Sequence, residues 1–135
     1  MGDKTMGVFA AAFIATTLLL GQFSVAAIEA VKPSGDWRIE CSGNAESNGT
    51  IQFRVLPKQG DVVTVSVKGA KGRSENEVAK DIRDAFRAQL PPGRFQAETD
   101  DGEDVLVKKK AGQPDFAIEL AGSDVEDVRL NVQRE

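Results

Sequence analysis

The chain contains no histidine and no tyrosine, and Cys41 is its only cysteine. The usual catalytic triads need a histidine base, and the common zinc and haem sites need histidine or paired cysteines, so the sequence excludes both kinds of site. Carboxylate-only chemistry, as in glycoside hydrolysis, needs a deep cleft, for which a chain of 135 residues has little room. We therefore predict that the protein is not an enzyme and carries no cofactor.

An excess of basic residues is also absent. The formal net charge is −4, and residues 95–135 carry 11 acidic residues against 5 basic ones. A protein that binds nucleic acid needs a basic surface to release the counterions of the phosphates. The charge pattern therefore predicts no nucleic-acid partner.

The only long apolar run is MGVFAAAFIATTLLL, at residues 6–20, and Lys4 precedes it. Residues 24–27 (SVAA) then offer the small side chains that a signal-peptide cleavage site requires. This layout predicts a signal peptide over residues 1–27, cleaved after Ala26 or Ala27, and a secreted or periplasmic protein. We expect a short exposed lead at 28–35 and a single domain at 36–135.

The alternative is an uncleaved membrane anchor, because the apolar run extends through residues 23–28 towards spanning length. Gln22 interrupts that extension, and no basic stop-transfer cluster follows it. The sequence therefore favours cleavage, and we expect a membrane-anchored protein only if the segment is retained.

Most of the remaining chain consists of short runs in which apolar and polar residues alternate. Pro, Gly and Asp separate these runs, a pattern typical of half-buried antiparallel strands. The predicted strands are residues 37–41, 50–56, 62–68, 94–99, 105–110, 115–121 and 128–133.

One helix is predicted between these strands, at residues 74–90. Ser74 and Glu77 have the spacing of a capping box, in which each side chain satisfies a backbone N–H of the first turn. Apolar residues recur at helical spacing from Val78 to Leu90, and the sequence PPG ends the helix. The apolar stripe predicts a helix that covers a sheet.

These elements predict an α+β fold, with a twisted, mostly antiparallel sheet of five to seven strands and one helix packed on one face. The predicted core consists of Trp37, Ile39, Ile51, Phe53, Val55, Val63, Val65, Val67, Val78, Ile82, Phe86, Leu90, Phe95, Val105, Val107, Phe116, Ile118, Leu120, Leu130 and Val132.

Cys41 shares one strand face with Trp37 and Ile39, so the alternation predicts a buried thiol. A single cysteine in an exported protein has no internal partner. The alternative is therefore an intermolecular disulfide through Cys41.

Basic residues and glycines precede the predicted helix in the sequence KGAKGRSE. A helix N-terminus attracts anions, which makes Lys71, Arg73 and Ser74 candidate anion ligands. The spacing does not fit a phosphate-binding loop, and a solvated connection is the simpler interpretation.

Four carboxylates gather in the sequence DDGED, and they make Asp100, Asp101, Glu103 and Asp104 candidate calcium ligands. The cluster lacks the alternating ligand spacing of a calcium loop, and Asp-Gly is also typical of a tight hairpin. The sequence favours the turn over a metal site. Separately, Asn48 begins an N-glycosylation sequon (NGT), which matters only in a eukaryotic secretory pathway.

A strand (VVTVSVKG), a helix (ENEVAKDIRDAF) and two further strands (GRFQAETDDGEDVLVKKKAGQPDFAIELAG) follow one another within residues 50–121. This order resembles the small β-α-β-β surface modules of phage-tail and flagellar-filament proteins. The resemblance implies the architecture of such a unit and assigns no functional residue.

Two functions are compatible with these observations. The first is an exported, non-catalytic binding protein that acts on a protein partner through a sheet edge or loops. The second is a structural or accessory subunit of an envelope or extracellular assembly, linked through Cys41.

Overall fold

The structure is a computed structural model that describes residues 32–135. The predicted signal peptide, its cleavage site and the first half of the predicted lead fall in residues 1–31, outside the described range. The described chain runs through β2 (Asp36–Ser42), β3 (Gly49–Pro57), β4 (Val63–Gly69), α2 (Glu75–Gln89), β5 (Phe95–Asp100), β6 (Asp104–Lys109), β7 (Phe116–Ser123) and β8 (Arg129–Arg134).

The strands form two antiparallel sheets, one with the order β5-β6-β2-β8 and the other with the order β4-β3-β7. The domain is therefore small, α+β and mostly antiparallel, as predicted, and each predicted strand is present. The division into two sheets was not predicted. Alternation identifies the buried face of each strand, but it does not say which other strand that face meets.

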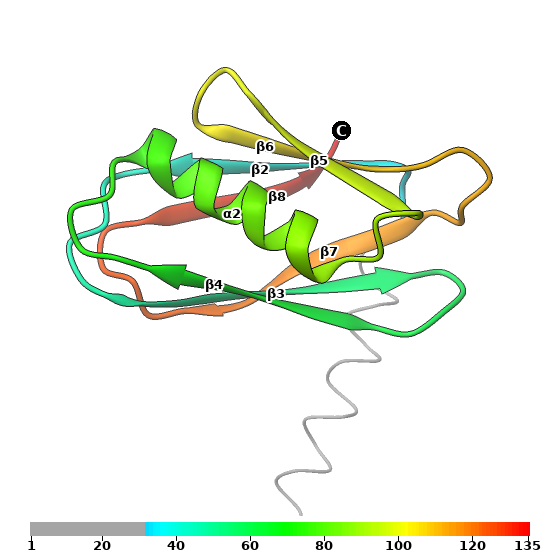
Figure 1. The fold of residues 1–135 in the computed structure, drawn as a ribbon, viewed down its shortest axis with the longest axis horizontal. Helices are drawn as coiled ribbons and strands as arrows, with labels where there is room; N and C mark the ends of the chain where they lie inside the picture. Colours follow the sequence, from blue (N-terminus) through cyan, green and yellow to red (C-terminus); the bar gives the residue numbers. More distant parts are fainter. Residues whose placement is uncertain (1–31) are drawn as a thin grey trace, which may run out of the picture. The chain divides into compact units, whose positions relative to one another are not determined.

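Helix α2 begins with the predicted capping box: Ser74 accepts from the Glu77 N–H, and the Glu77 carboxylate accepts from the Ser74 N–H. Its buried residues include Ile82 and Phe86, and the ring of Phe86 meets Phe53 edge-on at 5.3 Å. The helix packs on β4 of one sheet and on β5 of the other, with further contacts to β2 and β6. Instead of covering one face of a single sheet, α2 closes one side of a sandwich (Figure 1).

The predicted core is confirmed except at four positions. Val63, Leu130 and Val132 are half-buried, and Leu120 is 39% exposed. Val63 is the first residue of its strand, while the other three lie on β7 and β8, away from α2. The exposure of those three follows from the side of the sandwich that the helix leaves open.

A buried tryptophan joins the two sheets. The Trp37 indole N–H on β2 donates to the Phe116 carbonyl on β7 at 2.8 Å. Phe116 also exchanges two backbone hydrogen bonds with Ser34, so the chain is tied to one sheet just before it enters the other. The last residues of the predicted exposed lead are therefore fixed against β7.

Candidate functional site

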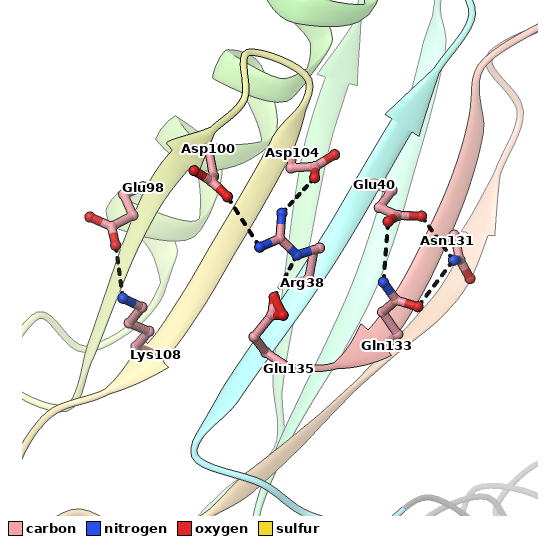
Figure 2. Close-up of polar contacts among 9 residues, drawn as sticks. All are labelled: Arg38, Glu40, Glu98, Asp100, Asp104, Lys108, Asn131, Gln133 and Glu135. Carbon is pink, nitrogen blue, oxygen red and sulfur yellow. Dashed lines mark hydrogen bonds and ion pairs between the residues drawn. The ribbon is translucent and has the colours of Figure 1, made fainter.

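The outer face of the four-stranded sheet carries a charged cluster centred on Arg38 of β2 (Figure 2). Its guanidinium lies 2.6 Å from the Asp104 carboxylate and 3.1 Å from that of Asp100, and Nε donates to Glu135. The hydrogen bonds to Glu135 and Asp104 raise the pKa of Arg38 above its ordinary value. The cluster thus joins β2 to the β5–β6 hairpin and to the residue that follows β8.

On the same outer face, hydrogen bonds to β2 hold two side chains of β8 in place. Asn131 and Gln133 both donate to the Glu40 carboxylate of β2, at 3.1 and 3.2 Å (Figure 2). Arg129, at the start of β8, is exposed and makes no side-chain hydrogen bond or ion pair with another described residue. The outer face therefore presents an ordered row of polar groups along β8, with an available cation at its beginning.

The edge of β8 opposite β2 has no strand partner within residues 32–135. The Glu135 N–H donates to the Asp36 carbonyl, and the Cys41 N–H donates away from β8, to the Glu103 carbonyl. Because antiparallel hydrogen bonding alternates along a strand, the N–H and C=O groups of Leu130, Val132 and Arg134 point outward. We call these backbone groups the free edge of β8.

An apolar strip lies beside this free edge. Leu130 and Val132 pair with the buried residues Cys41 and Ile39, which places them on the inner face of their sheet. Leu120 pairs with the buried Phe53 on the inner face of the other sheet. Helix α2 covers the β4 and β5 side of the sandwich, so these three side chains remain partly open to solvent on the β7 and β8 side.

The acidic turn has the hairpin structure that the sequence favoured. Asp101 and Gly102 have φ values of 51° and 79°, and they connect the paired residues Asp100 and Asp104. The carboxylates of Asp100 and Asp104 contact Arg38, and Asp104 is 8% exposed. No group of three or more ligands that could hold a metal ion occurs among the described residues.

The candidate anion ligands before α2 already have partners. The Arg73 guanidinium makes two hydrogen bonds to Asp81 and lies 3.5 Å from Glu77, and the Ser74 hydroxyl caps the helix. Lys71 is exposed, and its backbone N–H donates to the Asn48 side chain. An anion at this helix end therefore competes with carboxylates of the chain itself, and the anion site stays a prediction.

The side chain of Asn48 is exposed, in the loop before β3. Its amide oxygen is the acceptor for Lys71, which orders the side chain without burying it. The glycosylation sequon thus lies on an accessible loop, and its use stays a prediction.

Cys41 is 2% exposed, as the alternation predicted. Burial, followed by the negative charges of Asp104 and Glu75, raises the pKa of this thiol to about 12. A disulfide between two copies requires an accessible thiolate, so the burial of Cys41 argues against the alternative, an intermolecular bond through this residue.

We expect Cys41 in the folded protein to resist alkylation by iodoacetamide at about pH 8, where an exposed thiol reacts readily. Because burial holds the pKa of the folded thiol above its ordinary value of 9.0, the protein is also expected to lose stability as the pH rises from about 9 towards 12. Mass spectrometry with and without denaturant checks the labelling. Rapid labelling of the folded chain would contradict the buried position.

No protein-family model matches this chain, and no curated protein shows a significant match. The resemblance of residues 50–121 to β-α-β-β surface modules therefore stays a prediction. In the described part of the chain, no helix is long and apolar enough to cross a membrane.

Sequence reasoning missed the Arg38 cluster and the free edge of β8. Alternation places Arg38 on the outer face, but only the strand order brings Asp100, Asp104 and Glu135 to it. Leu130 was expected in a closed core. The available signal was its strand, where polar residues make up four of the six positions.

Proposed function

We propose that the protein is an exported, non-catalytic binding protein that acts on a protein partner through the free edge of β8. One observation carries the proposal: α2 covers the β4 and β5 side of the sandwich, whereas the outward backbone groups of β8 have no partner within residues 32–135. An extended segment of another chain that adds to such an edge gains main-chain hydrogen bonds.

The apolar strip supplies the second part of this binding mode. The inward side chains of an added strand would lie beside Leu130 and Val132, and burial of the apolar strip would favour binding. On the outer face, the hydrogen bonds from Asn131 and Gln133 to Glu40 restrict the side chains of β8 before a partner binds. Less conformational entropy is then lost on binding.

Export is the part of the proposal that rests on the sequence. The apolar run at residues 6–20 and the small residues at 24–27 support a cleaved signal peptide and a secreted or periplasmic location. A retained segment would make the protein membrane-anchored. N-terminal sequencing of the native protein distinguishes the two.

The second candidate is a structural or accessory subunit of an envelope or extracellular assembly. The burial of Cys41 argues against a covalent link between subunits. Such a subunit would instead assemble without disulfides, and the unpaired edge of β8 is the feature that favours this function.

Replacing Val132 by proline is expected to abolish capture of the partner. Proline removes the outward N–H at the centre of the free edge while the hydrogen bonds from β8 to β2 remain. The matched control is Val132→Thr, which keeps the N–H and the branched shape. The measurement is affinity capture from the native envelope or culture supernatant with each variant as bait.

The native chain and Val132→Thr should retain the same proteins, and Val132→Pro should lose them. Thermal unfolding followed by circular dichroism verifies that each bait is folded. Equal retention by all three folded baits would contradict the proposal, as would the absence of any retained protein.

A further inference from the structure

We infer that the strand received by the free edge of β8 is β8 of a second copy of the chain, in a symmetric antiparallel pair. The inference rests on the proposed function, since both use the same edge, and it names the partner. The resulting sheet would run without a break through both copies, from one β5 to the other. A two-fold axis would pass through Val132.

The backbone supports this register. Leu130, Val132 and Arg134 are the residues of β8 whose N–H and C=O groups point outward. In an antiparallel pair centred on Val132, each Val132 faces the other, and Leu130 of one copy faces Arg134 of its mate. All three outward residues of each strand then exchange hydrogen bonds with outward residues of the other strand.

The charges support the same register independently. With Val132 at the centre, Arg129 of each copy lies directly opposite Glu135 of the other, on the polar outer face. Arg129 is exposed and makes no side-chain hydrogen bond or ion pair with another residue of 32–135, and the Glu135 carboxylate is 40% exposed. Opposite charges that face each other across strands attract, and a shift by two residues in either direction separates both pairs.

The remaining pairs agree with this arrangement. Asn131 would face Gln133 on the outer face, and these amides can bond to each other while they still donate to Glu40. On the inner face, the pair would cover Leu130 and Val132, opposite the inner face of the other sheet, which carries Leu120. The dimer thus buries the apolar strip that α2 leaves open.

Arg129→Glu and Glu135→Lys are each expected to prevent self-association. Each variant replaces the two attractive pairs between copies by two repulsive ones, which should raise the dimer dissociation constant at least about tenfold. Glu135→Lys also removes a carboxylate that pairs with Arg38, so circular dichroism must show that this variant is folded. A mixture of the two variants restores opposite charges at both contacts. The mixture should therefore dimerise although neither variant does so alone.

The experiment is sedimentation equilibrium of the full chain, purified from the compartment that receives it, from about 1 μM to about 500 μM. The expected native mass is twice that of one chain, unchanged by reductant because Cys41 is buried. Lys68→Glu is the matched control for Arg129→Glu: Lys68 is exposed on β4 of the other sheet, and its reversal changes the net charge by the same amount. This control should remain dimeric.

A native protein that stays monomeric over this range would overturn the inference, and so would a dimer that both charge variants retain. Variants that fail to restore a dimer when mixed would also count against it. If the native chain is monomeric while Val132→Pro still abolishes capture of another protein, only the inference fails. If Val132→Pro keeps both the dimer and the capture of another protein, the proposed use of the free edge is rejected.

Discussion

Replacing Phe86 by aspartate is expected to abolish the cooperative thermal unfolding transition. The Phe86 ring is fully buried between α2 and β3, with the Phe53 ring 5.3 Å away. Removing such a ring costs about 3–5 kcal/mol, and burying an unpaired charge in its place adds about 3 kcal/mol or more. The sum is comparable to the entire stability of a small domain, about 5–15 kcal/mol.

Circular dichroism during heating measures this effect. Ala88→Asp on the same helix is the control, because Ala88 is exposed and the new charge remains in water. Its expected cost is below about 1 kcal/mol, mainly from a negative charge near the helix C-terminus. A Phe86→Asp variant that melts like the native protein would refute the packing described here.

The second large effect is expected for Arg38→Met, which should lower the free energy of unfolding by about 2–4 kcal/mol. The change leaves Asp100, Asp104 and Glu135 close together without the cation that now joins them. Asp104 contributes most to the loss, because its side chain is only 12% exposed and water cannot replace the guanidinium. Urea unfolding of both proteins gives the difference.

Two comparisons make this measurement specific. Lys108→Met breaks the more exposed pair with Glu98 on the same face, and its expected cost is at most about 1 kcal/mol. Adding Asp104→Asn to Arg38→Met should recover part of the lost stability, because the amide carries no charge. Equal losses for Arg38→Met and Lys108→Met would show that the Arg38 cluster contributes no more than a surface pair.

The sequence predicted the local structure well because its signals are local. The box formed by Ser74 and Glu77 determines where α2 begins, and Asp101 and Gly102 turn the chain between β5 and β6. Each strand was likewise found from its own alternation. These features depend on residues within a few positions of one another, so the amino-acid sequence alone is sufficient to predict them.

Strand order depends on residues that are far apart, and there the sequence was not sufficient. Nothing near Arg38 indicates that Asp104 will pair beside it or that Glu135 will reach it. Leu120 looks like a core residue because it alternates correctly with Ile118. It is 39% exposed only because α2 lies on the opposite side of the sandwich, which the period of its strand cannot reveal.

The position of β2 at the centre of its sheet has a consequence for the order of folding. Strands β3 and β4 are joined by a short hairpin and can pair as soon as both have been synthesised. Strand β2 comes first among the described strands, yet its neighbours are β6 and β8, and Trp37 pairs with Arg134. Contacts of such long sequence separation slow folding, since a large loop must close before they form. The pairing of β2 with β8 therefore cannot be complete until residue 134 has been synthesised.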